Sequence, residues 1–143
     1  MINPLEFSER EEVISMSFIE IKGLSKIFLQ GNQKIYGIRN ANLSIEKGTF
    51  MSVIGRSGSG KSTFLNLVGG IENPTSGEVF FDGKSIHQFK DKELTKFRNQ
   101  HIGYVFQQYH LLKELTVLEN IRLPLDIGRK AYDHSYEEEL LDL

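Results

Sequence analysis

Residues 53–70 read VIGRSGSGKSTFLNLVGG, and this stretch constrains the fold of the chain more than any other. The run TFMSVIG at residues 49–55 is apolar and ends in glycine, which predicts a strand buried on both faces. The run STFLNLVGG that follows spaces its apolar residues as a helix does. A glycine-rich loop between the two costs conformational entropy when it becomes ordered, so we expect a ligand there.

The loop contains the spacing G-x-x-x-x-G-K-[ST], with Gly55, Gly60, Lys61 and Ser62 at its defined positions. Glycines let backbone N–H groups turn toward phosphate oxygens, and the following helix adds the positive end of its dipole. Lys61 can neutralise phosphate charge, and the Ser62 hydroxyl suits Mg²⁺. An accidental flexible loop is the alternative, but composition alone gives this match in roughly 0.5% of chains of this length. The residues predicted to hold a triphosphate are Gly55, Ser57, Gly58, Ser59, Gly60, Lys61, Ser62 and Thr63.

The rest of the chain alternates between strand and helix patterns. The predicted β-structure consists of strands at 18–24, 36–48 and 101–106 and a hairpin around Asp82-Gly83. The predicted helices are an amphipathic helix over 91–99, a helix from Val117 that Pro124 ends, and a C-terminal helix opened by a capping box of Ser135 and Glu138. We expect its acidic run, EEELLDL, to be solvent-exposed, and we expect surface or loop positions for His87, His101, His110 and His134, which show no ligand spacing.

The composition excludes several other classes of protein. The 143 residues are 39% hydrophobic and 25% charged, as in one soluble domain or most of one. A net charge of −2 without a long basic run gives no sign of nucleic-acid binding. The absence of cysteine excludes disulfides and thiolate chemistry, and no apolar run approaches the length of a membrane span. Residues 1–17 are predicted to be a polar N-terminal extension, with Met16 as an alternative start.

Four separated motifs, in order, resemble the ATP-binding-cassette (ABC) transporter ATPases. They are LSKIF with NLSIEKG, the phosphate loop, PTSGEVFFDG, and HIGYVFQQYHLLKELTVLENIRLPL. The similarity runs from about Phe18 to the C-terminus and is greatest to the macrolide-export and lipoprotein-release branch. It implies an α/β P-loop NTPase fold with a RecA-like core and an antiparallel β subdomain over 18–106. The Q-loop and the start of a helical subdomain would follow at 107–143.

The resemblance also assigns roles to two residues outside the loop, and it names the cofactors as ATP and Mg²⁺. Phe28 occupies the position of an aromatic residue that stacks on adenine. Without the family, a packing role for Phe28 would be favoured; Tyr36, the nearest rival aromatic, is expected to pack in the sheet. Gln107 takes the Q-loop position, which in the family reaches Mg²⁺ and the attacking water. Lys61 and Gln107 are therefore the candidate catalytic residues.

The later motifs of the family do not occur in these 143 residues. There is no LSGGQ-type signature, no Walker B strand ending in Asp-Glu and no switch histidine. We therefore expect an amino-terminal portion of an ABC ATPase that has no significant ATPase activity alone. Strands without their neighbours would leave open edges, so we also expect poor solubility.

The family implies two kinds of partner, a second ATP-binding subunit and membrane permease subunits. The chain would then lie on the cytoplasmic face of the membrane. A soluble ABC ATPase acting in translation or DNA repair and a decayed gene product are alternative interpretations. A nucleoside kinase or GTPase would share the phosphate loop, but it gives no reason for the Q-loop region.

Overall fold

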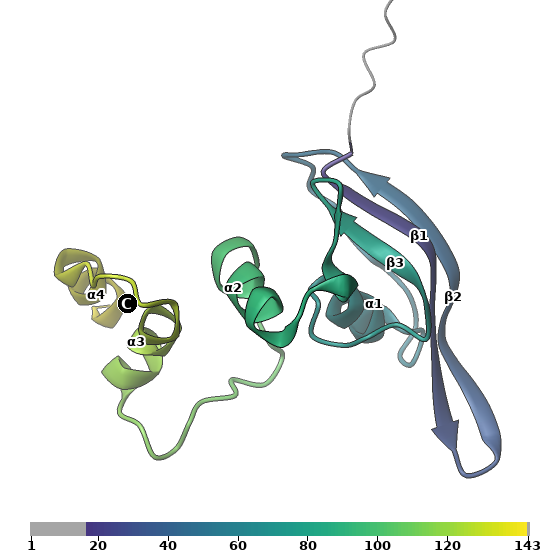
Figure 1. The fold of residues 1–143 in the computed structure, drawn as a ribbon. Coiled ribbons are helices and arrows are strands. Elements are labelled where there is room, and N and C mark those ends of the chain that lie inside the picture. The colour runs from purple at the N-terminus through teal and green to yellow at the C-terminus, as the bar shows by residue number, and fades with distance from the viewer. Residues whose placement is uncertain (1–16, 143) are drawn as a thin grey trace, which may run out of the picture.

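A computed structural model describes residues 17–142. Its four strands form one antiparallel sheet in the order β2-β1-β3-β4, on the right-hand side of Figure 1. The strands are β1 (Ile19–Gln30), β2 (Gln33–Ile45), β3 (Ser76–Phe81) and β4 (Lys84–Ser85). β1 pairs with β2 on one side and with β3 on the other. The first strand therefore joins the β1–β2 hairpin to β3, which comes much later in the sequence. The strand predicted at 18–24 is confirmed as β1, which is longer than predicted. The strand predicted at 36–48 is confirmed as β2, which has the predicted length but begins and ends three residues earlier.

The short turn between β3 and β4 has the conformation that its sequence predicts. Asp82 and Gly83 both have positive φ, 48° and 74°. Two successive positive φ values match the tight hairpin turn that Asp-Gly favours between strands. The predicted hairpin is confirmed.

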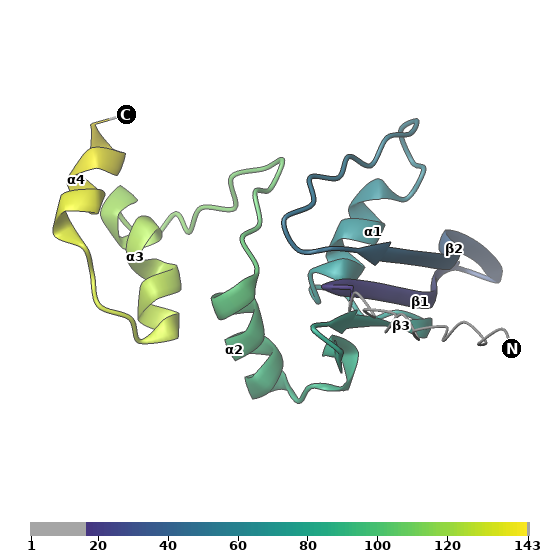
Figure 2. The ribbon, with the colours of Figure 1, turned by 90° about the horizontal axis from the view of Figure 1, so that it is seen from above.

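The core lies between one face of the sheet and helix α1 (Lys61–Val68), as Figures 1 and 2 show. The sheet contributes Ile21, Leu24, Val79 and Phe81, α1 contributes Phe64 and Leu67, and the 3₁₀ turn η1 (Ile86–Gln88) contributes Ile86. The helix predicted after the phosphate loop is therefore present, and it buries its apolar side. Close packing of these side chains holds the loop at the N-terminus of α1 against the sheet.

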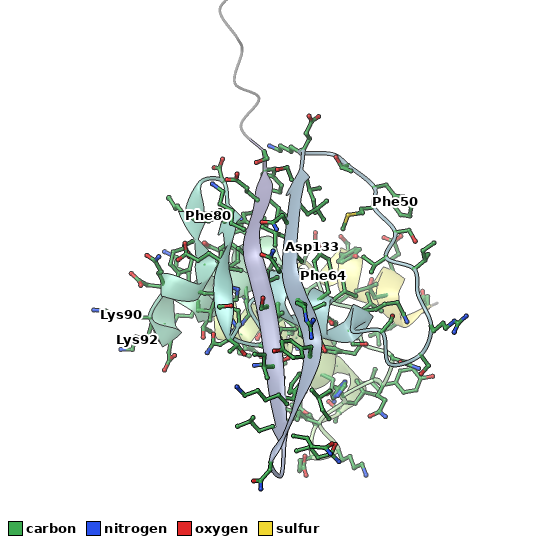
Figure 3. The ribbon with its side chains drawn as sticks, turned by 90° about the vertical axis from the view of Figure 1, so that its right-hand side faces the viewer. Phe50, Phe64, Phe80, Lys90, Lys92 and Asp133 are labelled. Carbon is green, nitrogen blue, oxygen red and sulfur yellow. The ribbon has the colours of Figure 1, made fainter. Side chains whose placement is uncertain are left out.

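The two other predicted strands are wrong. His101, the first residue of the strand predicted at 101–106, is the last residue of a helix, and within residues 17–142 neither 49–55 nor 102–106 forms a strand or joins the sheet. Phe50 is 95% exposed and Val105 is 97% exposed, whereas a strand buried on both faces would cover them. A strand needs a neighbour to pair its backbone N–H and C=O groups, and the described chain places none beside these segments. Figure 3 shows Phe50 on the loop beyond the edge of β2.

Three further helices follow the hairpin: α2 (Asp91–His101), α3 (Val117–Gly128) and α4 (His134–Leu141). Figures 1 and 2 place α3 and α4 farther from the sheet than α2. The amphipathic helix predicted over 91–99 is confirmed as α2. No helix within residues 17–142 has the length and apolarity needed to cross a bilayer.

The predicted end of α3 at Pro124 is wrong, because the helix continues through this residue. Proline removes one backbone N–H bond from a helix interior. The Pro124 carbonyl accepts a hydrogen bond from Asn99 Nδ2 of α2 at 2.7 Å, a contact between the two helices that local sequence does not contain. The helix ends instead at Arg129, which adopts a left-handed conformation.

The C-terminal helix forms, but its cap and its acidic face differ from the prediction. Asp133, not Ser135, is the N-cap, and its side chain accepts from the Tyr136 N–H. Glu137 is buried rather than solvent-exposed. Its carboxylate accepts two hydrogen bonds from Arg122, each 2.7 Å long, and this pair joins α4 to α3. The Arg122 guanidinium also holds the pKa of Glu137 below its ordinary value.

His87 is a further correction, since it is neither a surface nor a loop residue. It lies in η1 and is partly buried, and within the described residues neither ring nitrogen has a hydrogen-bond partner. Burial lowers its pKa, because the charged imidazolium loses solvation. The predicted N-terminal extension, residues 1–17, lies outside the described residues except for Ser17.

Candidate phosphate-binding site

The glycine-rich loop ends at Gly60, which caps the N-terminus of α1. Gly60 has a φ of +88°, and within the described part of the chain no side chain caps the first turn of the helix. A Cβ at this position would lie 2.1 Å from the carbonyl oxygen of Gly37 in β2. Only glycine therefore allows both the backbone angle and the close approach of the loop to the sheet.

The Lys61 side chain folds back over the loop that precedes it. Its Nζ donates to the carbonyl oxygens of Gly55 at 2.9 Å and Arg56 at 2.8 Å. The loop is also closed by a hydrogen bond from the Ser59 N–H to the Arg56 carbonyl, at 3.2 Å. A cation and the uncapped N–H groups of α1 thus share one small region, which is favourable for an anion.

A cavity of about 390 Å³ lies over this loop. Its wall comes from four separate parts of the chain: β1, β2, the loop with the start of α1, and the segment after residue 106. The predicted site residues that line it are Phe28, Ser57, Gly58, Ser59, Gly60, Lys61, Ser62, Thr63 and Gln107. Gly55 instead lines a neighbouring hollow, where its carbonyl accepts from Lys61.

Phe28 and Tyr36 both reach this cavity. The Phe28 ring covers Gly37, where an added Cβ would lie 2.7 Å from its Cε2 atom, and it remains 38% exposed. Tyr36 was expected to pack in the sheet, but it is 47% exposed and lines the cavity wall. The Arg39 guanidinium lies 3.9 Å from the centre of the Tyr36 ring. Sequence reasoning missed Tyr36 because strand alternation alone does not say which face meets a ligand.

The polar residues of the cavity have the chemistry of a Mg²⁺ site that is completed by phosphate. Ser62 and Gln107 supply a hydroxyl and an amide oxygen, which are hard ligands of the kind Mg²⁺ prefers. Within residues 17–142, no cluster of three or more His, Asp or Glu side chains could hold a metal ion. A Mg²⁺ ion in this cavity would take its remaining ligands from phosphate oxygens and water, as this cation commonly does.

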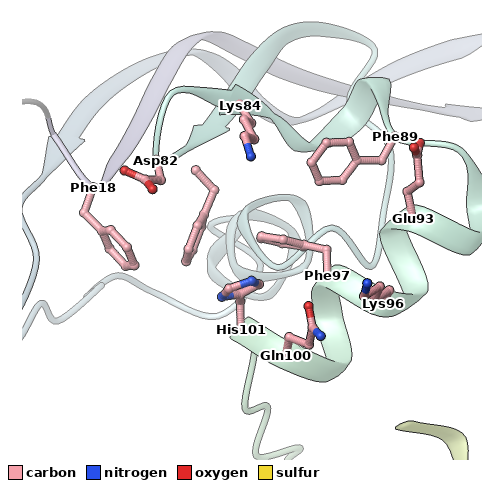
Figure 4. Close-up of a pocket in the computed structure, with 10 residues that line it drawn as sticks. Phe18, Asp82, Lys84, Phe89, Glu93, Lys96, Phe97, Gln100 and His101 are labelled. Carbon is pink, nitrogen blue, oxygen red and sulfur yellow. The ribbon is translucent and has the colours of Figure 1, made fainter.

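A second hollow, shown in Figure 4, has a different character. It measures about 420 Å³ and shares no residue with the phosphate-loop cavity. Its floor consists of aromatic rings, among them Phe18, Phe81 and Phe97, that pack edge to face. These rings are the open margin of the hydrophobic core.

The glycine-rich loop, its lysine and the helix that follows form the phosphate-binding element of a P-loop NTPase. The ABC transporter family model matches residues 38–142, so the chain belongs to the ABC transporter family. An uncharacterized ABC transporter ATP-binding protein of Methanocaldococcus jannaschii is 48% identical over 75% of this chain and 46% of its own length. The lipoprotein-releasing system ATP-binding protein LolD of Colwellia psychrerythraea is 45% identical over 77% of this chain and 43% of its own.

The comparison with solved structures gives the same family. An ATP-binding cassette solved as a dimer, in a post-hydrolysis state bound to ADP and Pi, superposes with a TM-score of 0.76. It is 43% identical, and the match covers 85% of this chain and 53% of that one. The chain spans about half the length of these relatives.

Proposed function

We propose that this chain binds Mg-ATP through the cavity over its glycine-rich loop, as the ATP-binding subunit of an ABC transporter of the exporter or lipoprotein-release type. One observation carries the proposal. Phe28, the loop residues and Gln107 are separated by tens of residues in the sequence and yet line a single cavity. The family membership supports ATP as the nucleotide.

Each part of the cavity has a role in this proposal. The amides of Gly58 to Thr63 and the Lys61 ammonium hold the phosphates, and Lys61 exchanges its two loop carbonyls for phosphate oxygens. Phe28 stacks on adenine. Ser62 and Gln107 hold Mg²⁺, which neutralises phosphate charge when bound.

The partners and the location follow from the same family. Relatives are named as ATP-binding proteins of a lipoprotein-releasing system, and one of 40% identity as a macrolide export ATP-binding/permease protein from Mannheimia succiniciproducens. We propose that the chain works with a second ATP-binding subunit and with permease subunits at the cytoplasmic face of the membrane. The division at residues 106 and 107 into a core and the start of a helical subdomain remains a prediction.

We further propose that this chain does not turn over ATP by itself. Phosphoryl transfer requires charge stabilisation and a positioned water in addition to a phosphate cradle. The 143 residues contain neither the signature motif nor the Walker B carboxylates. A steady-state assay on the purified chain should therefore give no turnover above background, and Lys61-dependent turnover would refute this part.

The binding proposal is tested with a fluorescent ATP analogue in the presence of Mg²⁺. Lys61→Ala should abolish saturable binding, because it removes the only cation that donates to the loop carbonyls in the described structure. Lys47→Ala is the matched control, since Lys47 is exposed and lines neither the cavity nor its neighbour. Equal affinity of the Lys61→Ala variant and the control, with unchanged circular dichroism, would contradict the assignment.

A further inference from the structure

A hollow of about 420 Å³ lies between α2 and the C-terminal end of α3, away from the phosphate-loop cavity. Three cationic side chains line it: Lys92 and Lys96 from α2, and Arg129 from the end of α3. The polar side chains of Thr95, Asn99 and Gln100 complete the polar lining, and among residues 17–142 no carboxylate lines it. We refer to it as the basic hollow.

The walls of the basic hollow are fixed by contacts between the two helices. Asn99 Nδ2 donates to the Pro124 carbonyl at 2.7 Å, and Lys130 Nζ lies 3.4 Å from the Asn99 carbonyl. A Cβ on Gly128 would lie 2.4 Å from Asn99 Oδ1, so the helices could not approach as closely with any other residue there. The hollow is thus formed before any ligand arrives.

The three cations are solvent-exposed, and none of them forms an ion pair within the described chain. The ion pairs of residues 17–142 use Lys22, Lys26, Arg122 and His134, and none uses a cation of the basic hollow. Two carboxylates of the same helices, Glu93 and Asp126, lie outside the lining of the basic hollow. Glu93 accepts from the Lys90 N–H at 3.0 Å, and Asp126 accepts from the Tyr132 hydroxyl.

Like charges gathered in this way repel one another. Lys92 and Lys96 are four residues apart on one helix face, which is destabilising for two cations, and Arg129 faces the same space. An anion with several oxygens and more than one negative charge would reverse this repulsion. The volume accommodates a phosphate group with several waters, each of which occupies about 30 Å³.

We propose that the basic hollow binds a phosphate-bearing anion. Arg129 donates to two phosphate oxygens, and Lys92 and Lys96 supply point charges from the opposite wall. The same chemistry is offered by a free diphosphate and by a phosphomonoester lipid headgroup. Figure 3 shows Lys92 projecting outward at the edge of the molecule, where either source can reach it.

The test uses the Lys61→Ala variant of the whole chain, so that the phosphate loop is impaired. Pyrophosphate is titrated while backbone amide NMR shifts are followed. We expect saturable shifts at Thr95, Gln100 and Gly128. Adding Lys96→Gln or Arg129→Gln should weaken binding about tenfold each, as the loss of one charge-assisted hydrogen bond does. Lys47→Gln should leave the affinity unchanged, because Lys47 is exposed and remote from this lining.

A second arm identifies the source of the phosphate. Co-sedimentation is measured with phosphatidylcholine vesicles that contain phosphatidic acid and with vesicles of phosphatidylcholine alone. Binding only to the first, lost in Arg129→Gln, assigns a lipid headgroup, and pyrophosphate binding alone assigns a free anion. The proposal is overturned if neither probe binds, or if the Lys96, Arg129 and Lys47 variants all bind equally. ATP binding to the wild-type loop is measured separately and does not decide this outcome.

Discussion

The antiparallel sheet and the segments 49–55 and 102–106 contain the same kinds of apolar residue, but those residues are buried in the sheet and exposed in the two segments. In the sheet, Leu24 and Val79 are fully buried beneath α1. In segments 49–55 and 102–106, Ile54 is 89% exposed and Val105 is 97% exposed. The difference is that β1 has a partner strand on each side, whereas the extended segments have none within residues 17–142. An apolar sequence can adopt a strand, but the strand forms only where a partner strand pairs its backbone N–H and C=O groups.

The largest expected effect tests this comparison directly. Leu24→Ala removes a fully buried side chain and should lower the free energy of unfolding by about 2–5 kcal/mol. Ile54→Ala is the matched change in an exposed segment and should alter it by less than about 0.5 kcal/mol. Urea unfolding followed by circular dichroism measures both. An Ile54→Ala cost as large as that of Leu24→Ala would mean that the extended segment is packed in solution.

The next effect concerns the junction between the sheet and the loop. Gly60→Ala places a methyl group 2.1 Å from the Gly37 carbonyl and should destabilise the chain by about 2–3 kcal/mol. Gly58→Ala is the control. Its φ is also positive, at +75°, but no atom lies within 4 Å of the added Cβ, so only the backbone strain of about 1 kcal/mol applies. If the two variants unfold at the same urea concentration, the loop is not seated on β2.

Local signals were sufficient for much of the fold. Alternating apolar and polar residues predicted β1 and β2. Asp82-Gly83 predicted the turn after β3, and the spacing of apolar residues predicted α1 and α2. The errors share a cause, because each depends on a contact that the local sequence does not contain. The segments at 49–55 and 102–106 lack a neighbouring strand, and α3 continues past a proline whose carbonyl accepts a hydrogen bond from Asn99 of another helix.

The candidate site divides in the same way. The glycine loop could be located from spacing, because its chemistry lies within eight residues. Phe28 and Gln107 could be placed near it only through the family resemblance, since nothing local relates them to the loop. Tyr36 was assigned to the sheet interior, and the structure shows that its face of β2 borders the cavity instead. Which face of a strand meets a cavity is decided by packing.

The smallest expected effect is on the pH dependence of stability, and it comes from His87, which lies beside the buried core. Burial lowers the pKa of His87 from its ordinary value of 6.5, although the Leu67 backbone and the Glu78 charge oppose this shift. The folded state therefore binds fewer protons than the unfolded state, and stability falls as the pH drops below about 6.5. The loss of solvation is the largest effect, so the Glu78 carboxylate, which also accepts hydrogen bonds from Ser85 and Gln88, offsets it only in part.

Replacing His87 by glutamine should flatten the stability profile between about pH 7.5 and 5.5, because the group that gains a proton on unfolding is removed. His110→Gln is the control, because His110 is exposed in the segment between α2 and α3. Urea midpoints at several pH values give both profiles. If His87→Gln keeps the wild-type slope, the ring is solvated in the folded chain and the core beneath η1 is open to water.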